Sequence, residues 1–252
     1  MSENPSPFVS IITVVFNAKD ALEHTIQSIL SQTNQSYEYI VIDGKSTDGT
    51  VEVIKKYQQH IAYWISEKDN GLYDAMNKAL YVAKGKYIWF MNAGDLIYDN
   101  HVIENLKKLY TPDVDVFYGE TVMIDAAGTV LGDRRLKAPE SLTYKNLSMG
   151  MVVCHQSFIA KRECCDYYNT DFKIAADIEW MINTLKHSKK IVNTHQYITR
   201  FKDDGLSKNN IVQSLTERFK IMIHHYGIIT TLFNHIRLGI NFFIYVLRHG
   251  RF

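Results

Sequence analysis

Residues 9–16 read VSIITVVF, an apolar run dominated by β-branched residues and as long as a typical strand. Such a run predicts a strand that is buried on both faces, as in a parallel sheet covered by helices. Apolar residues then recur at helical spacing from Leu22 to Leu30. We therefore expect the chain to begin with a buried strand followed by a helix.

The same pattern continues through the first hundred residues. Further strands are predicted at residues 37–42, 61–66 and 87–91, with helices at residues 51–57 and 73–83 between them. Strands that alternate with helices indicate an α/β fold, with a Rossmann-like, mostly parallel central sheet flanked by helices. The later part of the chain predicts short strands at residues 113–131, strands at 152–160 and 191–199, and a helix at 177–185.

Composition limits the class of protein. With 252 residues, the chain suffices for one large domain plus an appendage. A formal charge of +1 argues against a nucleic-acid partner bound through a basic surface. The three cysteines have no metal-ligand spacing, which favours reduced thiols. The first seven residues lack a basic region followed by an apolar one, so we expect no signal peptide and a cytoplasmic location.

The end of the chain predicts a separate feature. We divide the protein into a main domain at residues 1–208 and a C-terminal amphipathic helical extension at residues 209–252. Within 228–247, polar residues form one narrow stripe and everything opposite is apolar, as in a helix lying on the inner face of the cytoplasmic membrane. A helix packed on the main domain or on a second subunit, as in a homodimer, is the alternative, and a true span ranks last.

Polar residues follow three of the predicted strands, at Asp43, at 67–70 and at 92–95. In parallel sheets, ligands bind beyond the carboxyl ends of the strands, so these side chains should surround one crevice. Asp95 follows a glycine at the end of a buried strand and could hold a divalent cation beside a phosphate. An acid–base reaction would also need a carboxylate or histidine, and Asp171, Asp177, Glu179 and His155 are the candidates of the second half.

Four motifs together resemble glycosyltransferase family 2, whose members have the GT-A fold. They are SIITVVFN at 10–17, VIDGKSTDGT at 41–50, SEKDNGLYDAMNK at 66–78 and NAGD at 92–95. The third is especially similar to enzymes that build bacterial capsule, O-antigen and exopolysaccharide. The resemblance is close over residues 9–96 and extends in scattered positions to residue 207.

The resemblance implies roles for residues in the first half. Asp43 would contact the nucleotide base, with Ser46 in the adjoining turn, and Asp69 would bind the base or the ribose. Asn77 matches the end of the family's Ala-Arg-Asn segment, in which Met76 here replaces the arginine, and Lys78 is the nearest substitute.

The motif at 92–95 matches the family's metal motif, but Asp95 is its single carboxylate. Asp95 would bind Mn²⁺ or Mg²⁺ on the diphosphate, and Asn92 would orient the phosphates.

The resemblance also identifies Asp177 as the catalytic base, with Ala176 in place of the family's glutamate. His155 and Gln156 resemble a pair on the acceptor side. Residues 204–207 are similar to a loop near the diphosphate, and the motif of processive synthases is absent, which favours one sugar per encounter.

The expected function is that of an inverting hexosyl- or N-acetylhexosaminyltransferase. It would move a sugar from a nucleotide-sugar donor, of which UDP-sugars are the first choice, to a glycan or lipid-linked acceptor. A nucleotidyltransferase or a dinucleotide-dependent oxidoreductase would need a glycine-rich loop after the first strand, where the chain has FNAK. A catalytically inactive sugar-nucleotide-binding or scaffold protein is the remaining alternative, because the metal motif has lost carboxylates.

Overall fold

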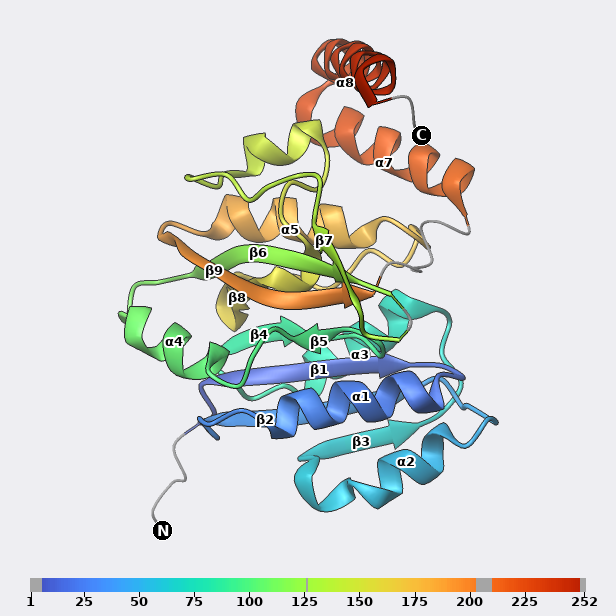
Figure 1. Ribbon diagram of the computed structural model, residues 1–252, viewed down its shortest axis with the longest axis vertical. Helices are drawn as coiled ribbons and strands as arrows, with labels where there is room; N and C mark the ends of the chain where they lie inside the picture. The colour runs from blue at the N-terminus through green and yellow to red at the C-terminus, as the bar shows by residue number, and fades with distance from the viewer. Residues whose placement is uncertain (1–5, 126, 203–209, 250–252) are drawn as a thin grey trace.

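The computed structural model of the protein describes residues 6–125, 127–202 and 210–249, with the side chains of the last helix described as far as residue 238. Its centre is a mixed sheet with the strand order β3-β2-β1-β4-β8-β6-β9-β5, and β7 pairs with β6 (Figure 1). The strands are β1 (Val9–Val15), β2 (Tyr37–Asp43), β3 (Tyr63–Ser66), β4 (Tyr87–Phe90), β5 (Leu96–Ile97), β6 (Val116–Ile124), β7 (Val130–Asp133), β8 (Phe158–Lys161) and β9 (Ile191–Lys202). The helices are α1 (Lys19–Leu30), α2 (Thr50–Lys56), α3 (Leu72–Val82), α4 (Val102–Leu109), α5 (Ala176–His187), α7 (Ile211–Tyr226) and α8 (Ile228–His249).

The parallel half of the sheet confirms the prediction. β2 and β4 both pair in parallel with β1, and β3 pairs in parallel with β2. Beyond β4 the sheet changes direction, because β8 runs antiparallel to both β4 and β6. The prediction of short strands within 113–131 was wrong for β6, a nine-residue strand paired on both sides with β8 and β9.

The strand predicted at 152–160 was also wrong in extent. β8 covers Phe158–Lys161, while His155–Ser157 forms a single 3₁₀ turn. A run of apolar and small residues does not reveal where pairing begins, because pairing depends on the neighbouring strand.

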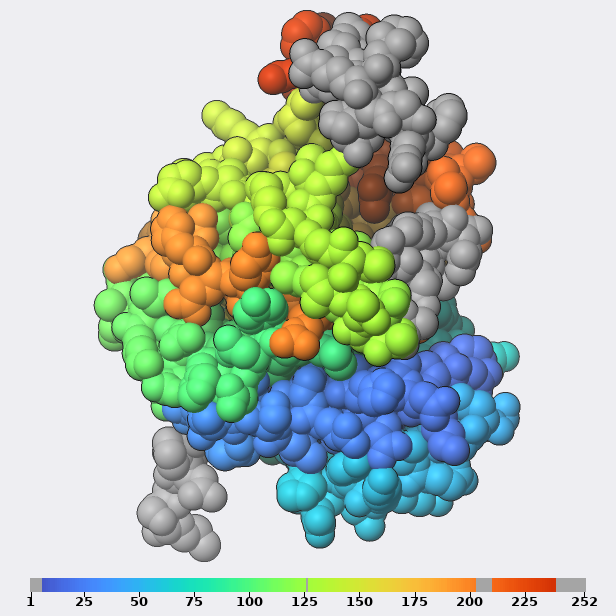
Figure 2. Space-filling model, in the orientation of Figure 1, coloured from blue at the N-terminus to red at the C-terminus, as the bar shows by residue number. Residues whose placement is uncertain are grey.

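Alternating residues of the buried strands divide the core into two layers, one on each face of the sheet. On one face, Ile12 and Val14 of β1 pack with α3 and α5. On the other, Val9 and Ile11 pack with α1, α2 and α4. Figure 2 shows the N-terminal part of the chain as one layer, with the later part stacked on it. The near-continuous apolar run of β1 is therefore explained by burial on both sides.

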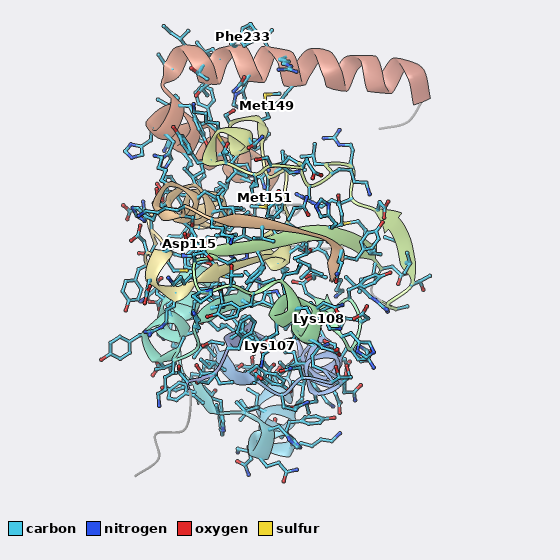
Figure 3. The ribbon with its side chains drawn as sticks, turned by 90° about the vertical axis from the view of Figure 1, so that its left-hand side faces the viewer. Lys107, Lys108, Asp115, Met149, Met151 and Phe233 are labelled. Atoms are coloured by element: carbon cyan, nitrogen blue, oxygen red, sulfur yellow. The ribbon has the colours of Figure 1, made fainter. Side chains whose placement is uncertain are left out.

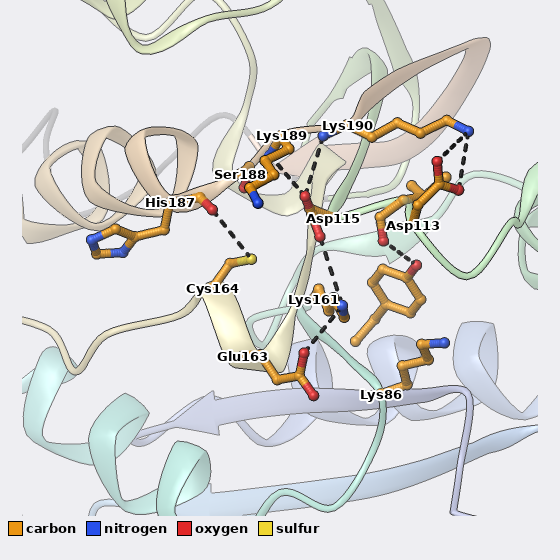
Figure 4. Close-up of polar contacts among 12 residues, drawn as sticks. Lys86, Asp113, Asp115, Lys161, Glu163, Cys164, His187, Ser188, Lys189 and Lys190 are labelled. Atoms are coloured by element: carbon orange, nitrogen blue, oxygen red, sulfur yellow. Dashed lines mark hydrogen bonds and ion pairs between the residues drawn. The ribbon is translucent and has the colours of Figure 1, made fainter.

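A buried carboxylate ties the strands together at the end of the sheet where β6 and β9 begin. Asp115 accepts hydrogen bonds from the backbone N–H groups of Lys189, at 2.7 Å, and Lys190, at 3.2 Å. Its other oxygen lies 3.8 Å from the Lys161 ammonium (Figure 4). This cluster fixes the turn between α5 and β9, a structural use of charge far from the ends of β1 and β2.

The two C-terminal helices have different environments. Ile221 and Met222 of α7 are buried in the same core layer as α3 and α5, so α7 is packed into the protein. The predicted boundary at 208/209 lies outside the described residues, and the two-part division stays a prediction.

α8 lies across the outer side, with Phe233 pointing away from the rest of the protein in Figure 3. Among the described residues, no helix combines the length and the apolar character that crossing a membrane requires.

Candidate functional site

The ends of β1, β2 and β3 meet around one buried carboxylate, Asp43, which is fully buried. Asp43 accepts hydrogen bonds from the Ser46 N–H at 3.0 Å, from the Ser46 hydroxyl, and from the Ser66 hydroxyl at 2.5 Å. Asn17, at the end of β1 with a φ of 46°, donates its N–H to the Ser46 Oγ at 2.7 Å. These four residues, Asn17, Asp43, Ser46 and Ser66, form the strand-end cluster.

Asp69 lies against the strand-end cluster through Gly44. A Cβ atom at Gly44 would stand 2.7 Å from the Asp69 Oδ2 and 3.3 Å from the Phe16 Cδ2. The Phe16 side chain is 63% exposed, which is unusual for a ring of its size. A carboxylate beside an exposed aromatic ring suits the ribose and base of a nucleotide, because rings stack on bases and carboxylates accept hydroxyl hydrogens.

The turn after β4 carries Asn92 and Asp95. Asp95 is buried, and its Oδ1 accepts a hydrogen bond from the backbone N–H of Lys202 at 3.1 Å. Thr25 of α1 donates to the backbone oxygen of Asp95 at 2.9 Å and accepts from the Gly94 N–H at 2.9 Å. This fixes the turn beside the end of β1.

The same turn is suited to a hard cation with few protein ligands. The Oδ1 of Asn92 is buried and accepts no hydrogen bond from the described residues, so an oxygen ligand stands in the same turn as the Asp95 carboxylate. Within the described part of the chain, no group of three His, Cys, Asp or Glu residues could hold a metal by itself. Mg²⁺ and Mn²⁺ accept one or two carboxylates when phosphates complete the shell, so the residues fit such an ion only together with a phosphorylated ligand.

The second predicted centre, Asp177, lies in the first turn of α5 and is partly exposed. Burial raises the pKa of its carboxyl group above the ordinary value, while Arg218 of α7 and the Tyr73 hydroxyl act in the opposite direction. A partly exposed carboxylate with a raised pKa is a stronger base than an ordinary aspartate, as a general base requires. Tyr73 stands four residues after Asp69, so one short segment joins the strand-end cluster to Asp177.

Two predicted site residues, Asn77 and His155, meet through Tyr168, which was not predicted. Asn77 donates from its Nδ2 to the Tyr168 backbone oxygen at 2.9 Å and accepts from the Tyr168 N–H at 2.7 Å. The Tyr168 hydroxyl lies 2.8 Å from the His155 Nε2, and its ring stacks on Tyr73 at 5.4 Å. Asn77 therefore holds the segment that packs against Tyr73, and its contact with the nucleotide stays a prediction.

His155 and Gln156 lie inside the protein. The His155 ring is 3% exposed and packs between Phe90 and Trp180, and burial lowers its pKa to about 3, so it is neutral. The backbone oxygen of Gln156 accepts from the Trp89 Nε1 and the Thr199 Oγ1, both at 2.7 Å. These are contacts of core residues, and the acceptor-side role of the pair stays a prediction.

The other predicted features are placed as follows. Of the candidate carboxylates of the second half, Asp171 is exposed and Glu179 lies 3.7 Å from the His225 ring. Asp177 is the one on whose pKa Tyr73 acts. Lys78 pairs with Glu67 at 2.8 Å, and residues 204–207 lie outside the described residues. Two surface hollows of about 340 Å³ and 600 Å³ contain none of the predicted site residues.

Sequence reasoning missed Ser66, Tyr73, Tyr168 and Arg218. Ser66 and Tyr73 gave a local signal, because both fall within the quoted motif at 66–78. The others reach the site through tertiary packing, and Arg218 comes from a helix that was expected to be an appendage.

Known proteins resemble this chain in sequence and in fold. The profile of Glycosyl transferase family 2 matches residues 10–166. The chain is 26% identical over 214 residues to the putative teichuronic acid biosynthesis glycosyltransferase TuaG of Bacillus subtilis, covering 82% of this chain and 84% of TuaG. It is 32% identical over 189 residues to the glycosyltransferase Rv1514c of Mycobacterium tuberculosis, covering 70% and 68%.

Solved structures resemble the fold at low identity. The S. aureus TarS 1–349 complex with UDP-GlcNAc superposes with a TM-score of 0.66 at 16% identity, over 85% of this chain and 66% of TarS 1–349. The mannosyltransferase PcManGT of Pyrobaculum calidifontis, in complex with GDP-Man and Mn²⁺, gives 0.65 at 17% identity, over 92% and 70%. These likenesses confirm the GT-A fold.

Proposed function

The chain belongs to glycosyltransferase family 2, and from this premise we propose that it is an inverting transferase for bacterial surface polysaccharide. The donor is a nucleotide-sugar, with a UDP-sugar as the first choice, and the acceptor is a hydroxyl of a glycan or lipid-linked saccharide. The observation that carries the proposal is that the Tyr73 hydroxyl lies close enough to Asp177 to act on the pKa of its carboxyl group. Tyr73 stands four residues after Asp69, and four residues span at most about 14 Å, so a proton acceptor lies in the neighbourhood of Asp69.

The protein's own residues divide the work between donor and acceptor. The strand-end cluster and Asp69 hold the nucleoside, with Phe16 available to the base. Asp177 accepts the proton of the acceptor hydroxyl, whose oxygen forms a bond to the anomeric carbon from the face opposite the diphosphate. The bond from that carbon to the diphosphate breaks, and its electron pair leaves with the diphosphate. One displacement inverts the configuration.

Asp95 and Asn92 are the residues that would hold Mn²⁺ or Mg²⁺. The ion supplies neutralisation of the negative charge that the diphosphate gains as it leaves. The buried, unpartnered oxygen of Asn92 within the described residues supports this assignment.

The proposal is tested by a variant that removes the base, Asp177, and leaves the binding of the donor intact. Asp177→Asn keeps the shape of the side chain and removes its ability to accept a proton, so transfer falls by at least about 100-fold. Binding of the nucleoside diphosphate, measured by calorimetry, stays within about twofold. Transfer is measured with a panel of UDP- and GDP-sugars, with and without Mn²⁺. An Asp177→Asn variant with normal turnover would remove Asp177 from the mechanism, and a wild-type protein inactive with every donor would favour the scaffold alternative.

We also propose that α8 rests on an anionic membrane surface, where a lipid-linked acceptor would be found. The polar side of α8 faces the protein, since Asn234 is buried and donates to the Ser148 backbone oxygen at 3.2 Å. The apolar side is exposed, with Ile229 at 82% and Phe233 at 67% (Figure 3). A packed helix shows the opposite arrangement.

Charge favours a lipid surface over a second subunit. Residues 219–252 contain four Lys or Arg residues and no Asp or Glu, so they are attracted to anionic headgroups. Two copies of this face would instead bring like charges together.

Phe233→Glu tests the membrane proposal, because it places a charge at the centre of the exposed apolar face. Sedimentation with phosphatidylglycerol vesicles should fall at least about tenfold, since a buried phenylalanine contributes roughly 1.5–3 kcal/mol. Val130→Glu, at an exposed position of the β6–β7 hairpin, is the matched control and should bind as the wild type does. Self-association of the wild type without vesicle binding would assign the face to a second copy.

A further inference from the structure

Glu217 of α7 is a buried carboxylate that receives an unusual set of donors. The backbone N–H groups of three consecutive residues before α5 all donate to it. The Lys173 N–H lies 3.0 Å and 3.1 Å from its two oxygens, while the Ile174 and Ala175 N–H groups reach Oε2 at 2.8 Å and 3.0 Å. Gln213, one turn earlier in α7, donates to Oε1 at 2.9 Å. Glu217 thus binds the segment that leads directly into Asp177.

Glu217 supplies the hydrogen-bond acceptor that the start of α5 lacks. The residue before the helix is Ala175, whose side chain cannot accept a hydrogen bond. A helix start leaves several N–H groups without helical partners and carries a partial positive charge, so a nearby anion stabilises it. Burial alone would raise the pKa of Glu217, but the donors from residues 173–175 and Gln213 outweigh burial and lower it. Glu217 is therefore ionised at neutral pH.

The next residue of α7, Arg218, acts on Asp177 itself. Its positive charge opposes the rise in the pKa of Asp177 that burial produces. The Arg218 Nε is buried and has no hydrogen-bond partner among the described residues. Besides Arg218, the titratable groups near Asp177 are Tyr73 of α3 and Tyr168, and Glu217 lies near Tyr73. Of the four residues just named, Arg218 is the one with a positive charge.

α7 is held firmly enough to position these two side chains. Ile221 and Met222 are buried on its inner side, in the core layer that contains α5. One turn later, the His225 ring lies 3.7 Å from Glu179 of α5 and 2.7 Å from the Lys186 ammonium. Glu217 thus binds the segment before α5, His225 contacts α5 itself, and the turn of α7 between them is buried in the core layer that contains α5.

We propose that α7 is part of the active site, with Glu217 and Arg218 as positioning residues for Asp177. Glu217 fixes the backbone from which Asp177 projects, and the positive charge of Arg218, the next residue of α7, favours the ionised form of Asp177. The inference rests on the proposed function, since it concerns the base of that reaction, and it extends the catalytic unit beyond residue 208.

Glu217→Gln tests the backbone contact. The amide keeps the size of the side chain but replaces one acceptor oxygen with a donor NH₂ group, which faces N–H groups that are donors themselves. Amide exchange in the 173–178 segment should accelerate by about tenfold or more, because charge-assisted hydrogen bonds are lost. The value of kcat should fall by about 10- to 100-fold with the donor KM unchanged, as expected for a misplaced catalytic group. Thr216→Ala, an exposed neighbour on the same helix, should match the wild type in both measurements.

Arg218→Gln tests the electrostatic effect of Arg218 on Asp177. Removing the cation leaves burial less opposed, so the acid limb of the kcat profile should move to higher pH. Arg218→Lys should restore the limb most of the way, since it restores the charge. A purely structural role of Arg218 would lower activity equally at every pH and would not be rescued by lysine.

These outcomes separate the inference from the proposed function. If Asp177→Asn is inactive while the Glu217→Gln and Arg218→Gln variants keep wild-type kcat and pH profiles, the inference is overturned and the proposed function stands. If Asp177→Asn keeps full turnover, the proposed function fails at its base, and the positioning role fails with it. Faster exchange in 173–178 without a change in kcat would likewise overturn a role in catalysis.

Discussion

A single methyl group added at Gly44 should weaken nucleotide binding and leave the stability of the fold unchanged. In Gly44→Ala the new Cβ would stand 2.7 Å from the Asp69 Oδ2, whereas ordinary contacts begin near 3.4 Å, so the carboxylate must move by about 0.7 Å. The Gly71 N–H, which donates to the Asp69 Oδ1 at 3.0 Å, resists that movement. A hydrogen bond of 2.8 Å that is stretched by 0.7 Å is lost. Because a hydrogen bond to a charged group contributes roughly 1.5–3 kcal/mol, affinity for the nucleoside diphosphate should fall by about 10- to 100-fold.

The backbone at Gly44 is not in the left-handed region, so alanine introduces no strain there, and the urea midpoint should change little. Gly128→Ala is the reverse control. Its φ is 81° and nothing lies within 4 Å of the added atom, so it should cost about 1 kcal/mol of stability and leave affinity unchanged. Calorimetry with UDP and Mn²⁺, together with urea unfolding, measures both effects. Wild-type affinity in Gly44→Ala would refute the placement of the nucleoside at Asp69.

Three further predictions follow from the contacts of individual carboxylates. Asp95→Ala should lower transfer at least about 100-fold and abolish its dependence on Mn²⁺; an unchanged Mn²⁺ titration would contradict the metal assignment. Asp115→Ala should lower the free energy of unfolding by about 2–4 kcal/mol, because two backbone N–H groups lose their acceptor, whereas Asp113→Ala, with an exposed side chain, should change it by less than about 0.5 kcal/mol in the same urea titration. Burial raises the pKa of Asp177 above 3.8, so on acidification kcat should begin to decline at a pH above 3.8, because the base becomes protonated. The same raised pKa should make the wild type lose stability as pH rises through the folded-state pKa, because the buried carboxyl group then ionises. Asp177→Asn should lack this loss, and a variant less stable than the wild type at pH 7 would contradict it.

Local pattern determined the first half of the protein. The apolar runs of β1 and β2 require burial on both faces, and the polar residues that follow them must then lie at one edge of a parallel sheet. That logic predicted a polar edge at Asp43, and the structure places the Ser46 and Ser66 hydroxyls on its carboxylate. The resemblance to the family contributed Asp177 as the proposed base, which composition alone would have missed.

Tertiary structure alone decided the surroundings of Asp177. Its sequence neighbours describe an ordinary helix start, and nothing local indicates that Glu217 and Arg218, some forty residues later, complete it. The helical period of α7 predicts which residues share a face, but it does not say what that face packs against. Similarly, the stripe on α8 predicted two sides of the helix, and only the fold showed that Asn234 faces inward and Phe233 outward. Spacing along the chain sets local geometry, whereas burial, and with it the pKa of a carboxylate, depends on segments brought together from distant parts of the sequence.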